Sequence, residues 1–432
     1  MFALKDKLFS SVGTLALTVT AGGTVSVGIS GEADAQWLWD RDRNVSVTQR
    51  PRPEYDALGM RAGAFVIRPE LLLAVEHNDN IFATATNTES DAIFVVNPSV
   101  AVDTTWSNHA LNAYADVRHN AYADFSSENT TDYSLGAGGR VDIARGSSVG
   151  FSASHSRGTE PRTSAGAAGF AAEPIRFDTT SFAIGTEHTF NRLRLRAGYD
   201  FAKTDYEDAR LIGGGVASQD FRDQDVHRFT LRGDLALSPD TAVFARYRYN
   251  ERDFRLAPPA VANNRDSDGY TFDVGVEFDL GGLARGEIGA GYMKQEYENP
   301  AFGTVDGFSV DGLLEWFPTQ LTTITFTARR SIEDAGIAAA SGYVGTGLSV
   351  QADHELLRNV ILTARVDYAT DDYQGIDRED RRWGATVQAT YMMNRNVGVA
   401  ASYSHLDQSS SGSAGSRDFR VNRFMVGVVL QY

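Results

Sequence analysis

The stretch RLRLRAGYDFA, residues 192–202, alternates between apolar and charged or small side chains along its whole length. Leu193 and Leu195 occupy one set of alternate positions, and Arg194 and Arg196 occupy the other. Successive side chains of a β-strand point to opposite faces, so a strand separates the leucines from the arginines, whereas a helix scatters the arginines around its circumference. The stretch therefore predicts a strand whose two faces meet two different solvents.

The same alternation recurs from residue 70 to the C-terminus in short segments separated by turn residues. Residues 226–237, 270–279 and 360–368 again set apolar positions against charged ones. Counting such segments predicts about 18 strands, an even number, which a membrane barrel needs if both of its ends lie on one side of the membrane. The expected fold is all-β: a single transmembrane antiparallel up-and-down β-barrel over residues 70–432.

The connections between these segments alternate in length. Short ones occupy residues 238–240 and 281–282, and long ones occupy residues 205–224, 252–266 and 408–417. Outer-membrane barrels have short periplasmic turns and long extracellular loops, whereas a soluble sandwich has no reason to sort its loops by strand parity. We therefore expect a protein of the outer membrane of a Gram-negative bacterium, with both termini in the periplasm.

The N-terminal region differs from the rest of the chain. Lys5 and Lys7 precede a mostly apolar run, and a small-x-small motif ends at Ala35. This order predicts a signal peptide over residues 1–35, with an uncleaved anchor helix as the alternative. Residues 36–69 are rich in proline and in alternating charges, which oppose both helix and central strand. We expect this segment to lie in the periplasm or partly inside the barrel lumen.

The chain ends with FMVGVVLQY, another alternating segment whose last residue is aromatic. A lipid-facing stripe that ends in an aromatic residue at the membrane interface is typical of barrel strands. The pattern resembles the C-terminal signature by which outer-membrane barrels are recognised for insertion, which implies the barrel-assembly machinery as a partner. The residues of this predicted insertion signal are Phe424, Val426, Val428, Leu430 and Tyr432.

The alternate positions that carry charge are expected to face the barrel interior. Charges this numerous cannot lie in a dry interior, so the lumen must be filled with water or densely paired. Two interpretations stay open: a basic side of the lumen that faces an acidic side and orients polar or anionic solutes, or ion pairs that hold a wide barrel in shape. The residues predicted to line the lumen are Arg194, Arg196, Arg228, Arg232, Arg246, Arg248, Asp273, Glu277, Asp279, Arg365 and Asp367.

The composition argues against catalysis and against nucleic acid as a partner. The chain has no cysteine, and its eight histidines are dispersed without a partner at metal-ligand spacing. The formal net charge of -16 disfavours binding to phosphates. We expect no enzyme activity, no cofactor and no metal. A barrel enzyme with serine, histidine and aspartate near its rim is the least favoured alternative.

Two stretches carry a family resemblance. Residues 52–65 read RPEYDALGMRAGAF, and residues 77–83 read HNDNIFA. Together they resemble the opening of the β-barrel porin 2 family, in which a lead-in RPEYDxxGxRxGxF precedes the first strand and a DDNIF stretch ends it. Asn78 stands where the family usually has the first aspartate, a mild departure. The resemblance extends over the lead-in, the barrel pattern and the terminal strand.

The resemblance implies a pore for polar solutes. Some family members are similar to outer-membrane components of exopolysaccharide export, which implies periplasmic polysaccharide-export components as partners, besides outer-membrane lipid and lipopolysaccharide. The second hypothesis is a structural or adhesive barrel whose lumen is plugged by residues 36–69.

Overall fold

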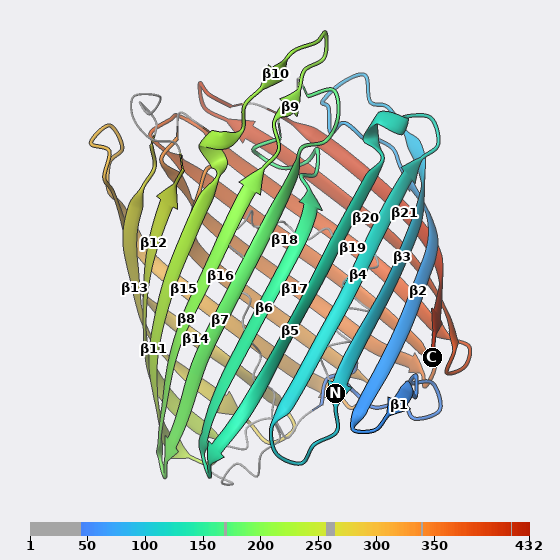
Figure 1. Ribbon diagram of the computed structural model, residues 1–432, viewed down its shortest axis with the longest axis vertical. Helices are drawn as coiled ribbons and strands as arrows, with labels where there is room; N and C mark the ends of the chain where they lie inside the picture. The colour runs from blue at the N-terminus through green and yellow to red at the C-terminus, as the bar shows by residue number, and fades with distance from the viewer. Residues whose placement is uncertain (1–44, 168–170, 256–263, 338–339, 416) are drawn as a thin grey trace.

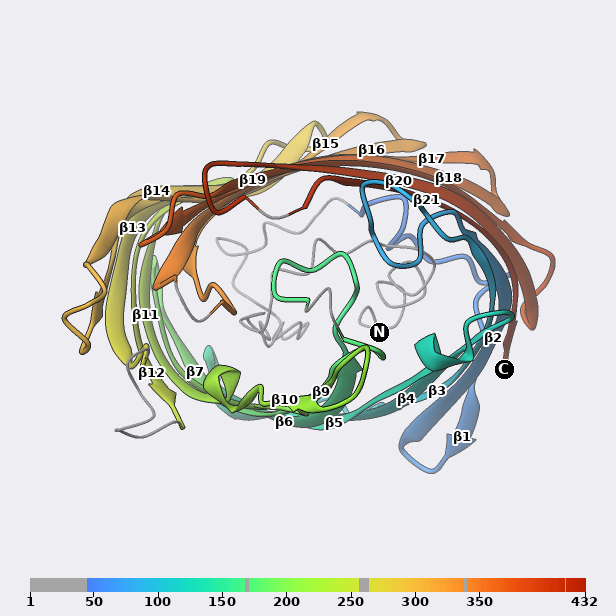
Figure 2. The same ribbon diagram turned by 90° about the horizontal axis from the view of Figure 1, so that it is seen from above.

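The computed structural model describes residues 45–167, 171–255, 264–337, 340–415 and 417–432. In this part of the chain, 18 antiparallel strands form a closed barrel with an oval outline (Figures 1 and 2). The strands are β2 (Phe65–Asn78), β3 (Asp91–Thr104), β4 (Ala110–Tyr122), β5 (Thr130–Ala144), β6 (Ser147–Thr159), β7 (Arg176–Phe190), β8 (Leu193–Tyr206), β11 (Gln224–Ser238), β12 (Thr241–Phe254), β13 (Ser267–Asp279), β14 (Ala284–Tyr297), β15 (Val305–Thr319), β16 (Thr322–Glu333), β17 (Gly342–Leu357), β18 (Val360–Gln374), β19 (Glu379–Met392), β20 (Val397–Ser411) and β21 (Phe419–Gln431).

The predicted fold class, an up-and-down barrel with about 18 strands, is therefore confirmed. The first strand begins at Phe65 rather than at residue 70, because Pro69 lies inside β2 without interrupting it. The Pro69 carbonyl accepts a hydrogen bond from the Tyr432 amide, so the ring nitrogen of Pro69 lies on the same side, away from β3. A proline is tolerated in a strand where its missing N–H is not needed by the ladder.

Strands β2 and β21 close the barrel. Their register runs from Glu70 opposite Gln431 to Asn78 opposite Arg423. Short strand β1 (Met60–Ala62) pairs with the first residues of β2, beyond the point where β21 ends. This pairing covers the remaining edge of β2, and a barrel without open edges is what a bilayer requires, since lipid offers no hydrogen bonds.

Gly59 joins this small hairpin to the end of the chain. Its backbone N–H donates to the carbonyl of Tyr432 at 3.1 Å. Its φ of +70° is in the left-handed region, and a Cβ at this position would lie 2.9 Å from the carbonyl oxygen of Ile67. A residue other than glycine would therefore strain the closure.

The two faces of the wall separate apolar from charged side chains as the sequence predicts. Leu195 and Leu231 are 44% and 59% exposed on the outer face, whereas Arg194 and Arg232 form ion pairs with carboxylates on the inner face. The terminal strand shows the same separation. The residues predicted as an insertion signal, four in β21 and one directly after it, are all exposed: Phe424, Val426, Val428, Leu430 and Tyr432.

Short connections gather at one end of the barrel, below in Figure 1, and long ones at the other end. We call these the turn end and the loop end. The loop end carries the small hairpin of β9 (Ala209–Arg210) and β10 (Val216–Ala217), and the 3-10 helices η2 (Ser126–Glu128) and η3 (Asp220–Arg222). No helix among the described residues is long and apolar enough to cross a membrane.

The described part of the N-terminal segment, residues 45–59, lies against the inner wall at the turn end. The backbone N–H of Val47 donates to Thr323 Oγ1 at 3.0 Å. Arg52 is 2% exposed and pairs with Glu355 at 2.9 Å. The predicted signal peptide and residues 36–44 lie outside the described residues.

Candidate functional site: the barrel lumen

One side of the lumen, from β8 through β15, carries a continuous network of ion pairs. Arg232 shows the pattern: it pairs with Asp234 at 2.8 Å, with Glu287 at 2.7 Å and with Glu277 at 3.3 Å. Among the described residues, five arginines and five carboxylates of this side pair with one another. We call them the ion-paired wall: Arg194, Arg196, Arg232, Arg246, Arg248, Asp234, Asp273, Glu277, Glu287 and Asp311.

The register explains why these charges need one another. Arg196 lies opposite Arg232, and Arg232 lies opposite Arg246, so three like charges meet on neighbouring strands. Like charges directly opposite destabilise a sheet. Asp234 and Asp273 offset them, since both are fully buried, and Asp273 lies opposite Arg246. The row is therefore neutralised within the wall.

The basic and acidic residues thus do not face each other across the lumen. Consecutive strands of an up-and-down barrel are neighbours, so the arginines of β8, β11 and β12 lie beside the carboxylates of β13 to β15. The arrangement corresponds to ion pairs that hold the wall in shape. Phe244 contributes to the same packing, because the Arg232 guanidinium lies 3.9 Å from the centre of its ring.

The other residues predicted to line the lumen lie apart from this network. Arg228 is opposite Asp200, and Asp279 is fully buried opposite Arg285 near the turn end. On β18, Arg365 pairs with Asp367 at 2.6 Å. The structure therefore brings together seven of the eleven predicted residues in the ion-paired wall, and places the remaining four elsewhere among the described strands: Arg228, Asp279, Arg365 and Asp367.

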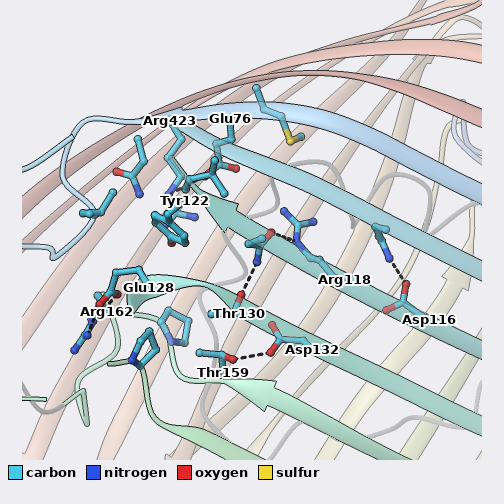
Figure 3. Close-up of a pocket in the computed structure, with 18 of the residues that line it drawn as sticks. Glu76, Asp116, Arg118, Tyr122, Glu128, Thr130, Asp132, Thr159, Arg162 and Arg423 are labelled. Carbon is cyan, nitrogen blue, oxygen red and sulfur yellow. Dashed lines mark hydrogen bonds and ion pairs between the residues drawn. The ribbon is translucent and has the colours of Figure 1, made fainter. Parts of the chain in front are cut away.

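A cavity of about 510 Å³ lies on the inner face of β2 to β6, with β20 and β21 beside it (Figure 3). We call it the side pocket. Asn97 donates to Asp116 at 2.7 Å, and Thr159 donates to Asp132 at 2.6 Å. Asn120 donates to Thr130 at 2.9 Å. The pocket is thus lined by hydrogen-bonding side chains that project from several neighbouring strands.

Glu70 and Glu76 also line the side pocket, and both were absent from the residues predicted to face the lumen. A signal for them is present in the sequence. Glu70, Glu76 and Asn78 share one set of alternate positions, whereas Leu71, Leu73, Val75 and His77 occupy the other. The alternation predicts the face of each residue, but not that five strands bring their polar residues to one hollow.

A loop between β6 and β7 covers the loop end of the lumen. We call its described part, residues 160–167 and 171–175, the mouth loop. Two ion pairs hold it: Arg222 with Glu160 at 2.6 Å, with both side chains buried, and Arg162 with Glu128 at 2.6 Å. Burial tends to lower the pKa of Arg222, but the hydrogen bond and the charge of Glu160 outweigh burial and raise this pKa above its usual value.

The mouth loop reaches the opposite side of the barrel. Arg417 donates to the carbonyls of Arg162 and Ser164, both at 2.8 Å. Ala165 packs against an apolar cluster that includes Tyr343 of β17. Strands β6 and β17 lie on opposite sides of the oval outline, and Figure 2 shows the loop inside it. The mouth loop therefore narrows the lumen at the loop end.

The apolar outer face, the closed wall and the charged lumen define an outer-membrane β-barrel protein. Residues 52–432 match the family model described as "Putative beta-barrel porin 2", and the chain belongs to this family. It is a porin-like barrel of the outer membrane of a Gram-negative bacterium. Within the described residues, no group of three or more histidine, aspartate or glutamate side chains could hold a metal ion.

The chain is similar to several solved structures at low sequence identity. OccK2 (OpdF) of Pseudomonas aeruginosa is 9% identical, with a TM-score of 0.47, and the match covers 84% of this chain and 98% of that one. OpdK of P. aeruginosa is 11% identical, with a TM-score of 0.42, and the match covers 85% of this chain and 99% of that one. The siderophore receptor PirA of Acinetobacter baumannii is 5% identical, with a TM-score of 0.45, and the match covers 84% of this chain and 80% of that one. No curated protein sequence matches the chain.

Proposed function

We propose that this protein is a pore that passes small polar solutes across the outer membrane. The observation that carries the proposal is a closed 18-strand barrel with a polar and charged inner face, because a barrel of this width can enclose a water-filled channel. A solute enters past the mouth loop and leaves at the turn end.

The proposed orientation has the turn end and both termini in the periplasm, with the loop end outside. It is supported by the difference in connection length, since outer-membrane barrels have short periplasmic turns. The exposed stripe of β21 is then the signal for the barrel-assembly machinery. The outer face contacts lipid, and the loop end contacts lipopolysaccharide.

Small solutes fit this lumen better than an exopolysaccharide chain does. Export of a polymer needs an unobstructed passage, whereas the mouth loop is tied to both sides of the barrel by Arg222 and Arg417. Polysaccharide export together with periplasmic export components is therefore the alternative function, and it requires that the mouth loop move aside.

The test is conductance of the purified full-length protein in planar bilayers. We expect discrete channels, and we expect Glu160→Gln to raise their conductance, because it removes the charge that holds Arg222. The matched control is Arg381→Gln, which breaks an exposed ion pair with Glu379 at the same end without touching the mouth loop. Absence of conductance at every voltage would overturn the pore. Equal conductance of the Glu160→Gln variant and the wild type would show that the loop is no constriction.

A second candidate is a structural or adhesive barrel with a plugged lumen. It is favoured by residues 45–59, whose Arg52 is buried against Glu355 at the turn end. Deletion of residues 36–58 distinguishes the two. A several-fold rise in conductance would identify this segment as a plug, whereas an unchanged conductance would identify it as part of the wall.

A further inference from the structure

We propose that the side pocket binds solutes that combine hydroxyl groups with a protonated amine. This inference rests on the proposed function, because it names the class of solute that the pore favours. Three observations carry it: an excess of carboxylates over arginines, their placement in the strand register, and serine hydroxyls that line the pocket without a hydrogen-bond partner among the described residues.

The carboxylates of the side pocket outnumber its arginines. Among the described residues that line it, six are acidic and three are arginines. Glu128 pairs with Arg162 and Glu160 pairs with Arg222, each at 2.6 Å, while Glu76 lies 3.8 Å from Arg423. Three lining carboxylates have no ion pair within the described part of the chain: Glu70, Asp116 and Asp132.

Glu70 and Asp116 lie in one row of the sheet. Glu70 is opposite Ser99, and Ser99 is opposite Asp116, so the two acids are separated by two strand spacings, about 10 Å at the backbone. Neither acid forms an ion pair with a described residue, and both lie on the concave surface of the pocket. Such a surface attracts cations and repels anions. A protonated amine between the two carboxylates lowers their mutual repulsion.

Two serines of β20 provide the second kind of contact. Ser402 and Ser404 line the side pocket and are 6% and 4% exposed, and neither side chain has a hydrogen-bond partner among the described residues. Neither hydroxyl oxygen is among the buried unpartnered atoms of the described residues, so both are open to the pocket and can donate to a ligand or accept from it. The hydroxyls of a small polyol or sugar have this chemistry.

The ion-paired wall does not compete for such a ligand. In the ion-paired wall, every carboxylate already contacts at least one arginine, and Asp273 also accepts a hydrogen bond from Ser309 at 2.5 Å. The amide of Asn97, by contrast, is a neutral partner for Asp116. Of these two regions, the side pocket is therefore the one that distinguishes the charge of a solute.

Three probes share one pyranose ring and differ mainly in charge: glucosamine with its amine protonated, neutral glucose, and anionic glucuronate. In bilayers, we expect glucosamine to permeate several-fold faster than glucuronate, with glucose between them. The double variant Glu70→Gln and Asp116→Asn should bring the ratio towards one. The matched control is Asp311→Asn, which removes a carboxylate of the ion-paired wall and should leave the ratio unchanged.

Titration calorimetry with glucosamine on the same proteins in detergent measures the site without requiring conduction. We expect binding to the wild type and to the Asp311→Asn variant, and at least a tenfold weaker affinity in the double variant. Conducting channels that favour glucuronate, or a ratio that the double variant leaves unchanged, would overturn the inference while the pore stands. If the protein does not conduct but still binds glucosamine, the proposed pore function is wrong and the proposed binding site stands. Absence of glucosamine binding to the wild type would overturn the site.

Discussion

The ion-paired wall and the side pocket are two regions of one lumen with similar residue types and opposite use of charge. In the ion-paired wall, Asp234 is fully buried and contacts three arginines: Arg194, Arg196 and Arg232. In the side pocket, Asp116 accepts a hydrogen bond from the neutral amide of Asn97 and forms no ion pair with a described residue. The first region uses its charges to hold the barrel together, and the second leaves them for a ligand.

The difference shows that the number of charges in a lumen does not determine what the lumen selects. Charges that neutralise one another within a wall contribute shape, because removing one partner leaves the other buried and unpaired. Charges without a partner contribute a field that a passing solute experiences. The local pairing, rather than the net charge of the chain, decides between the two.

The largest expected effect tests the ion-paired wall. Asp234→Asn removes the carboxylate that contacts three arginines, so we expect the free energy of unfolding to fall by about 3–5 kcal/mol. Denaturant unfolding of the refolded protein in lipid vesicles measures it. A loss below about 1 kcal/mol, the range of exposed pairs, would contradict the structural role of this wall.

The same chemical change in the side pocket provides the contrast. Asp116→Asn keeps the shape of the side chain and breaks no ion pair, so we expect the free energy of unfolding to change by less than about 1 kcal/mol. The permeability ratio of glucosamine to glucuronate should still fall. If the Asp116→Asn variant loses as much stability as the Asp234→Asn variant, the distinction between the two regions fails.

Salt should separate the two regions further, with a smaller effect. At about 1 M salt the screening length is about 3 Å, so the field of exposed charges is largely lost, while buried pairs are screened much less. We expect the permeability ratio of glucosamine to glucuronate to approach one, and the denaturation midpoint to move little. A barrel that loses stability as fast as it loses selectivity would contradict this separation.

The smallest expected effect lies in the loops outside the membrane. The backbone N–H of Ser413 donates to Asp377 at 2.8 Å and holds the pKa of this carboxyl below its usual 3.8. The contact is therefore fully present above the usual pKa and is lost as the pH falls through the lowered pKa. The protection of the Ser413 amide, meaning its exchange rate relative to that of an unprotected amide at the same pH, should be lost only at such acidic pH. In the Asp377→Asn variant this protection should no longer change with pH over the same range.

Much of the fold could be predicted from short stretches of sequence. The alternation in residues 192–202 assigns each side chain to a face, and the parity of the connections orders the strands around the barrel. The start of β2 was missed because Pro69 reads as a strand breaker. Proline is tolerated there because of Tyr432, which is more than 300 residues away in the chain. Tyr432 comes to lie beside Pro69 only when the barrel closes.

The alternating pattern settles on its own which side chains face lipid and which face the lumen, since a strand turns every second residue the same way. It does not settle which lumenal charges touch. That depends on register across strands, as between Arg232 and Glu287, and on loops that meet over the mouth, as between Glu160 and Arg222. These contacts join residues far apart in the chain, and only barrel closure brings them within bonding distance.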